Sequence, residues 1–137
     1  MKKFVCLVGL AVLFSGCGPS HVSHKIPSLN QKSKKVIKAS ELPSGCKVVG
    51  EAIGVDYIKS NEKHTDVDTL MQGAENDLKN RAVKMTNIAR PIIKINNRNI
   101  ICVGSNGKSF NCNYEEAKSG KFKVNSVECS GIVLNCN

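Results

Sequence analysis

Aromatic residues are scarce in this sequence. The 137 residues include no tryptophan, two tyrosines and four phenylalanines, and two of the phenylalanines, Phe4 and Phe14, lie in the first sixteen positions. The remaining rings can fill only a thin core, and a domain of about 90 residues buries only about 60 to 65% of its surface. Such a domain needs stabilisation of another kind.

Residue patterns that mark common catalytic and metal sites are also missing. Beyond residue 45 the only histidine is His64, in a polar stretch, whereas hydrolytic catalysis needs a base placed beside a nucleophile. His21 and His24 stand three residues apart, but no further ligand lies nearby to complete a metal site. Glu51 and Asp56 could form an acid pair, although exposed carboxylates at strand ends are far commoner than catalytic ones. We therefore predict a protein without enzymatic activity, cofactor or metal.

No apolar run is long enough to cross a membrane, which takes about twenty residues. The run from residue 4 to residue 14 follows the cationic Lys2 and Lys3 and precedes small residues and Cys17. These are the three zones of a secretory signal. We expect residues 1 to 16 to be a signal peptide that is removed on export.

The residues around the cleavage point refine this expectation. The pentapeptide 13–17, Leu-Phe-Ser-Gly-Cys, resembles the lipobox of bacterial lipoproteins, with Phe14 where an aliphatic residue is usual. The resemblance implies that acyl chains such as palmitate are attached to Cys17, and two or three chains anchor a protein stably where one binds only marginally. Gly18, which is not aspartate, implies sorting to the outer membrane, with the domain facing the periplasm or the cell surface. The alternative is ordinary secretion with Cys17 as a plain thiol.

Residues 17 to 45 are predicted to form a flexible, basic tether. They are mostly polar, include three prolines and no aromatic residue, and so offer nothing to close a core. No acidic residue precedes Glu41, and the lysines of the segment are Lys25, Lys32, Lys34, Lys35 and Lys38.

The charge of the exported chain bears on its partners. Without the signal peptide it carries 18 basic and 11 acidic residues, a net charge of +7. Outside the cytoplasm this charge favours membrane lipid heads, lipopolysaccharide phosphates or cell-wall carboxylates as partners rather than nucleic acid. The alternative is that the charge serves solubility alone.

A folded domain is predicted for residues 46 to 137, where apolar residues become periodic. A helix from Asp66 or Asp68 to about Met85 is indicated by apolar positions at helical spacing, acids in its first turn and basic residues near its end. The pattern is that of a helix lying on a sheet. Strands are predicted at 48 to 57, 88 to 95, 100 to 103, 108 to 113, 121 to 127 and 131 to 134, with turns at 96 to 99, 105 to 107 and 119 to 120.

Cysteines provide the stabilisation that the thin core lacks. The exported domain contains Cys46, Cys102, Cys112, Cys129 and Cys136. Outside the cytoplasm these predict a disulfide framework, and the absence of a Cys-x-x-Cys pair argues against a metal or thioredoxin-like redox site. Because five is an odd number, one thiol stays free or pairs with another molecule.

Three segments of the domain resemble a known family. Residues 46–54 (Cys-Lys-Val-Val-Gly-Glu-Ala-Ile-Gly), 70–82 (Leu-Met-Gln-Gly-Ala-Glu-Asn-Asp-Leu-Lys-Asn-Arg-Ala) and 129–136 (Cys-Ser-Gly-Ile-Val-Leu-Asn-Cys) look like uncharacterised bacterial outer-membrane lipoproteins. That family is distantly related to RcsF, the lipoprotein that senses envelope stress for the Rcs phosphorelay. The resemblance implies an α+β domain, with one helix packed on a small, mainly antiparallel sheet and two disulfides, displayed from a lipid anchor.

The chain also departs from that family. Residues 86–88, Thr-Asn-Ile, replace the usual Gly-Ala-Asn turn, and residues 96–125 look specific to this chain. RcsF places a cysteine after its Gly-Glu-x-x-Gly strand, where residues 55–57 here are Val-Asp-Tyr. A sensor role is therefore only weakly implied.

The disulfide pairing follows partly from local geometry and partly from the resemblance. A two-residue turn at Asn106-Gly107 would place Cys102 opposite residue 111 and turn Cys112 to the other face, so a bond between these two cysteines is not expected unless a bulge shifts the register. Antiparallel pairing of the first and last strands would join Cys46 to Cys136, as the resemblance also implies. The second bond would join Cys129 to Cys102 or Cys112. The analogy to RcsF favours Cys102, which leaves Cys112 free.

Two classes of function follow. The first is a cell-envelope lipoprotein, anchored through Cys17, that acts as a non-catalytic binding or sensing module for an outer-membrane protein, lipopolysaccharide or the cell wall. The second is a small periplasmic or surface-exposed enzyme or adhesin of unknown substrate. A deep pocket with converging polar groups would favour an enzyme.

Overall fold

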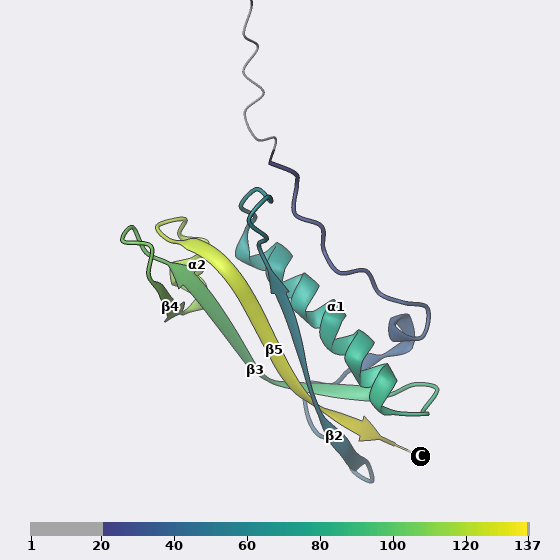
Figure 1. Cartoon of the computed structure of the whole chain (residues 1–137). Helices are drawn as coiled ribbons and strands as arrows, with labels where there is room; N and C mark the ends of the chain where they lie inside the picture. Colours follow the sequence, from purple (N-terminus) through teal and green to yellow (C-terminus); the bar gives the residue numbers. More distant parts are fainter. Residues whose placement is uncertain (1–20, 137) are drawn as a thin grey trace, which may run out of the picture.

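A computed structural model of the chain describes residues 21 to 136 (Figure 1). The predicted signal peptide and the lipidation site Cys17 lie outside the described residues. Within them the elements follow in the order η1 (Ser33–Lys35), β1 (Ile37–Lys38), β2 (Lys47–Tyr57), α1 (Val67–Met85), β3 (Ile92–Val103), β4 (Ser109–Cys112), α2 (Tyr114–Lys118) and β5 (Lys123–Asn135).

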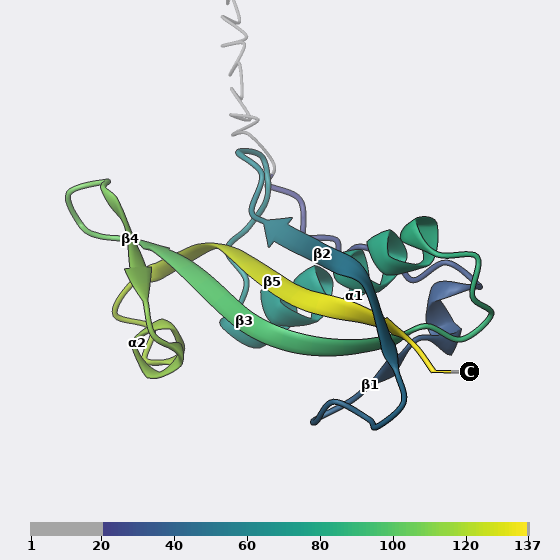
Figure 2. The ribbon, with the colours of Figure 1, turned by 90° about the horizontal axis from the view of Figure 1, so that it is seen from below.

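The strands form one mixed sheet with the order β1-β3-β5-β2, and β4 pairs with the far part of β3. The pairs β2–β5, β3–β5 and β3–β4 are antiparallel, and only β1–β3 is parallel. Helix α1 packs on one side of this sheet, and the strands cross in front of it when the molecule is seen from below (Figure 2). The predicted α+β class, with one main helix on a mainly antiparallel sheet, is confirmed.

Helix α1 begins and packs as its sequence predicts. Asp66 caps it by accepting a hydrogen bond of 2.8 Å from the backbone N–H of Thr69. Its buried side lies so close to β2 that a Cβ atom on Gly54 would overlap the helix backbone. Only glycine allows this approach of strand and helix. The buried residues of the helix are Val67, Leu70, Gly73, Ala74, Leu78 and Ala82.

Strands β3 and β5 are longer than the sequence predicts. The turn expected at 96 to 99 is absent, because β3 continues through it with a register shift between Ile95 and Asn97. A bulge of this kind absorbs one extra residue and bends the strand without ending it. The break expected between 127 and 131 is likewise absent from β5, whose residues pair without a gap from Val127 to Gly131. Polar residues there mark an exposed face, not a turn.

The hairpin between β3 and β4 differs by one residue from the predicted register. Val103 pairs with Ser109, so the connection contains five residues, 104 to 108, and Gly107 adopts a positive φ of 75°. Cys102 then lies opposite Phe110, not residue 111. Because neighbouring strand residues face opposite sides, this single step turns Cys112 to the side of Cys102.

Helix α2 follows β4 and was not anticipated. Asn113 caps it, and the Asn113 and Glu116 side chains each accept a hydrogen bond from the other residue's backbone N–H. This is a capping box, which the spacing Asn-x-x-Glu could have revealed.

The segment predicted as a flexible tether packs against the domain. The segment runs along α1 before it enters the sheet as β1 (Figure 1). Val36 is buried in the core, and Ser33 is buried under η1. The expectation that nothing here contributes to a core is therefore wrong, because Val36 packs into the core although Ile37 and Leu42 stay exposed. Within residues 21 to 136 no helix is long and apolar enough to span a membrane.

Candidate functional site

The amino-terminal segment docks onto the loop between β2 and α1. The backbone N–H of Val22 donates to the carbonyl of Asn61 at 3.0 Å, and the N–H of Lys63 donates to the carbonyl of Val22 at 2.8 Å. These two bonds form an isolated parallel bridge between residues 22 and 62. Segments forty residues apart in the sequence are thus joined through their backbones.

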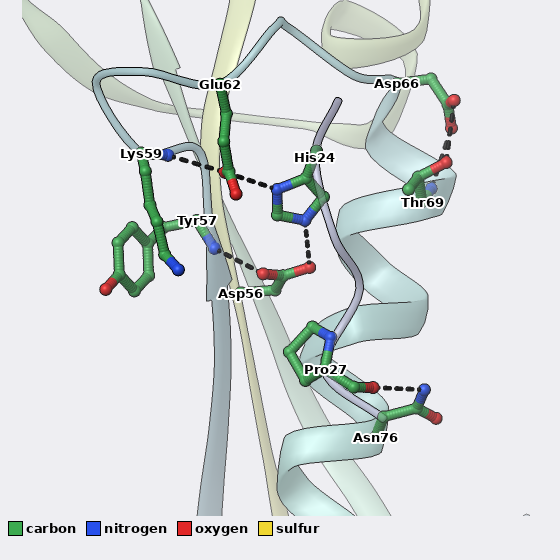
Figure 3. A network of polar contacts seen from close by, with 9 residues as sticks. All are labelled: His24, Pro27, Asp56, Tyr57, Lys59, Glu62, Asp66, Thr69 and Asn76. Carbon is green, nitrogen blue, oxygen red and sulfur yellow. Dashed lines mark hydrogen bonds and ion pairs between the residues drawn. The ribbon is translucent and has the colours of Figure 1, made fainter. Parts of the chain in front are cut away.

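A side-chain network lies beside this bridge (Figure 3). His24 points between two carboxylates: its Nε2 lies 2.8 Å from Asp56 Oδ2, and its Nδ1 lies 2.8 Å from Glu62 Oε2. The three side chains are almost fully buried, with exposed fractions of 3% for His24, 5% for Asp56 and 6% for Glu62. We call these three residues the clasp, because they fasten the amino-terminal segment to the end of β2 and the loop that follows.

The position of Asp56 follows from strand alternation. On β2 the buried positions are Ala52, Gly54 and Asp56, so Asp56 points toward α1. Its carboxylate fits against the helix only because residue 73 is glycine, since a Cβ atom there would overlap the carboxylate. The backbone N–H of Tyr57 donates a further hydrogen bond of 2.9 Å to Asp56 Oδ1. Both carboxylate oxygens therefore have partners.

The protonation of the clasp favours a charged histidine. Burial lowers the pKa of His24, but the hydrogen bonds to Glu62 and Asp56 outweigh it and raise that pKa above its ordinary value of 6.5. The backbone N–H of Lys59 and the His24 ring hold the pKa of Glu62 below 4.5. Burial raises the pKa of Asp56, and His24 opposes this. Two ring N–H groups can donate to two carboxylates only when His24 is an imidazolium.

Two asparagines of α1 hold the next part of the segment. Asn76 donates from Nδ2 to the carbonyl of Pro27 at 2.9 Å (Figure 3). Asn80 donates to the carbonyl of Ser28 at 2.9 Å and accepts from the backbone N–H of Asn30 at 3.2 Å. The side-chain amides replace the partners that a neighbouring strand would give this irregular backbone. The docked segment is therefore fastened along the helix as well as at the clasp.

One carboxylate of α1 forms ion pairs with both β1 and β3. Glu75 accepts from Lys38 Nζ at 2.6 Å and from Arg98 Nη2 at 2.9 Å. Lys38 is one of the lysines predicted to make the tether basic, and in the structure its charge is paired within the domain. Burial raises the pKa of Glu75, and the hydrogen bonds from Lys38 and Arg98 outweigh it and leave the pKa lowered.

The contacts of the clasp attach the amino-terminal segment to the domain. Both ring nitrogens of His24 are engaged and the ring is buried, so no nitrogen is left to take a proton from a nucleophile. Within residues 21 to 136 no three His, Cys, Asp or Glu side chains converge as metal ligands. His21 is exposed and takes no part in the clasp, so the structure does not join it to His24. Glu51 is exposed on β2 while Asp56 is buried, so these two carboxylates do not form a pair.

The disulfides agree with the prediction in one case and not in the other. Cys46 and Cys136 are bonded, with Cα atoms 4.2 Å apart, as the pairing of Lys47 with Asn135 requires. The second bond joins Cys102 to Cys112, not to Cys129. The prediction that Cys112 is the free thiol is wrong, because the longer hairpin connection brings Cys102 and Cys112 to the same face.

Cys129 is the free cysteine of the described residues. Its side chain is fully buried, and burial raises the pKa of its thiol to about 11. A buried thiol that stays protonated is a poor nucleophile. Cys129 therefore fills space in the core.

One signal in the sequence could have revealed the clasp. The alternation of β2 places Asp56 on the same side as Ala52 and Gly54, and a carboxylate on a buried face requires a partner. Nothing local identifies that partner as His24, which lies 32 residues away. From the sequence alone, His24 is considered only as a metal ligand beside His21, because residues 17 to 45 are predicted to stay apart from the folded domain.

The chain matches no protein-family model, no curated protein and no solved structure. The likeness to lipoproteins related to RcsF therefore stays a prediction, and the site has to be interpreted from its own chemistry.

Proposed function

We propose that the protein is a cell-envelope lipoprotein, anchored to the outer membrane through acylated Cys17, whose domain is a non-catalytic binding or sensing module. The signal-like residues 1 to 16 and the lipobox-like pentapeptide supply the anchor in this proposal. Two disulfides, Cys46–Cys136 and Cys102–Cys112, are consistent with a chain that folds outside the cytoplasm.

The observation that carries the proposal is the docking of the segment that leads to Cys17. Only residues 18 to 20 separate the anchor from His21, where the described fold begins. Four residue steps span at most about 14 Å. With the clasp closed, the domain is held at the membrane surface.

Release of the segment would change that placement. If residues 21 to 45 left the domain, about 29 residues would separate Cys17 from Cys46, with an extended reach of about 100 Å. The clasp therefore sets how far from the membrane the domain can find a partner. An outer-membrane protein, lipopolysaccharide or the cell wall are the partners that we propose, and nucleic acid is not among them.

Processing and location test the proposal. Intact-mass analysis of protein from the membrane fraction should give a chain that begins at Cys17 and carries two or three acyl chains. Cys17→Ser should leave an unacylated chain that a high-salt wash removes from the membrane fraction, whereas the matched Cys129→Ser should be acylated normally and resist the wash. An unmodified amino terminus, or membrane association of Cys17→Ser that survives the high-salt wash, would contradict the anchor.

A further inference from the structure

Three connections of the fold gather at one end of the molecule. They are the loop of residues 58 to 66 after β2, the turn of residues 104 to 108 after β3, and the turn of residues 119 to 122 before β5 (Figure 1). The strand registers require this arrangement, because Tyr57 pairs with Ser126 and Val103 pairs with Lys123. We call this the loop end.

The docked segment reaches the same end. Val22 pairs with the loop at Glu62, and the chain continues from there toward residue 21 (Figure 1). The clasp fixes this entry point, since His24 is bonded to both Asp56 and Glu62. Whatever holds residue 17 therefore lies within about 14 Å of the loop end, the span of four extended residues.

The loop end carries unpaired positive charge. Five lysines lie at this end of the molecule. All five are exposed, and none forms an ion pair with a carboxylate of residues 21 to 136. They are Lys59, Lys63, Lys108 and Lys121, together with Lys123, the adjoining first residue of β5.

Three of the acidic residues nearby are already engaged. Glu62 is held by His24 and by the backbone N–H of Lys59. Asp66 caps α1, and Asp68 accepts from Lys118. None of these three acids forms an ion pair with a lysine of the loop end.

We propose that the loop end is a membrane seat, which binds the phosphates of anionic lipids in the leaflet that carries the anchor. This inference rests on the proposed acylation of Cys17 and adds a second, electrostatic contact to it. A basic surface gains about 1 kcal/mol, or about fivefold in affinity, for each lysine close to an anionic leaflet. Acyl chains and basic residues together are the usual pair of signals for stable attachment.

The position of these lysines distinguishes the membrane seat from other basic residues of the chain. Lys32, Lys35 and Lys84 line a separate hollow of about 380 Å³ at the other end of α1. A helix of 19 residues places the two ends about 28 Å apart. In the docked state that second group points away from the leaflet that holds the anchor, and so serves as a matched control.

The test uses the mature chain, residues 17 to 137, exported with Cys17→Ser so that no acyl chain drives binding. This chain keeps all the described residues. It should bind vesicles that contain phosphatidylglycerol in phosphatidylcholine, release as salt rises, and bind pure phosphatidylcholine at least tenfold more weakly. Exposed charges are screened over about 8 Å at physiological ionic strength, which explains the salt effect.

Two triple variants decide the location. Lys59→Gln, Lys63→Gln and Lys123→Gln together should lower vesicle affinity at least tenfold, whereas Lys32→Gln, Lys35→Gln and Lys84→Gln should lower it less than about threefold. Arginine at 59, 63 and 123 should restore binding, which shows that the glutamine variant lost charge and not fold. Equal losses in the two glutamine triples, or equal binding to neutral and anionic vesicles, would overturn the seat. If intact mass still shows acylated Cys17, the proposed anchor survives that failure.

Discussion

The carboxylate of Asp56 occupies the space beside Gly73 that any larger side chain would fill. This fit places an acid on the buried side of β2, where His24 of the docked segment can reach it at 2.8 Å. A helix residue without a side chain therefore makes room for a contact between two other parts of the chain.

Gly73→Ala should weaken the clasp and destabilise the domain. Alanine normally stabilises a helix by up to about 1 kcal/mol relative to glycine, so a loss of about 1 to 3 kcal/mol here would report the overlap with Asp56. Thermal or urea unfolding measures the loss. In a double-variant cycle, Asp56→Ala should remove most of the penalty of Gly73→Ala, because the overlapping group is gone. Simple additivity of the two changes would contradict this geometry.

The docked segment should loosen as the pH rises above neutrality. Since the pKa of His24 is raised above 6.5, its contribution to docking is complete below that value and is lost as the pH rises through the raised value. The lowered pKa of Glu62 gives the opposite limit, because its contribution is lost as the pH falls through a value below 4.5. The raised pKa of Asp56 acts in the acid range: its contribution is complete below pH 3.8 and is lost as the pH rises through the raised value. The contributions of His24 and Glu62 are therefore both complete between pH 4.5 and pH 6.5.

An NMR titration checks this pH dependence. The His24 ring and the backbone amide of Lys63 should titrate together, at a pH above 6.5, because the pKa of His24 is raised above that value. A His24 ring that titrates at or below pH 6.5, with an unchanged Lys63 amide, would show that the histidine is not held by the two carboxylates.

The disulfide pattern can be read directly by non-reducing peptide mapping. Cys46 should be recovered with Cys136, and Cys102 with Cys112. Cys129 should resist alkylation in the native protein and react after unfolding, because it is buried and its thiol pKa is raised to about 11. A peptide that links Cys129 to Cys102 would restore the pairing predicted from the resemblance and would require a different register of β3 against β5, where Cys129 lies opposite Arg98.

Features that depend on local sequence were predictable. Helix α1 and its Asp66 cap follow from apolar spacing and an acid at the start. The bond between Cys46 and Cys136 follows from antiparallel pairing of the first and last strands. In each case the deciding signal lies in one short segment or in the ends of the domain.

Features that depend on a one-residue difference in strand register, or on partners distant in the sequence, were not predictable. The connection at 104 to 108 contains five residues where a two-residue turn is predicted, and the changed register decides which face Cys112 occupies. The clasp depends on His24, whose partners lie 32 and 38 residues away. Composition indicated disorder for that segment, and the asparagines and carboxylates that hold it belong to other elements.

Native-state hydrogen exchange of the docked segment tests the central claim most directly. At pH 6 the amides of Val22 and Lys63, which bond to Asn61 and Val22, should be protected in the native protein and in the matched variant His21→Ala. His24→Ala removes hydrogen bonds to charged groups worth about 1.5 to 3 kcal/mol each, so protection should fall at least tenfold. Fast exchange of both amides in the native protein, or protection that survives His24→Ala unchanged, would contradict a segment fastened by the clasp.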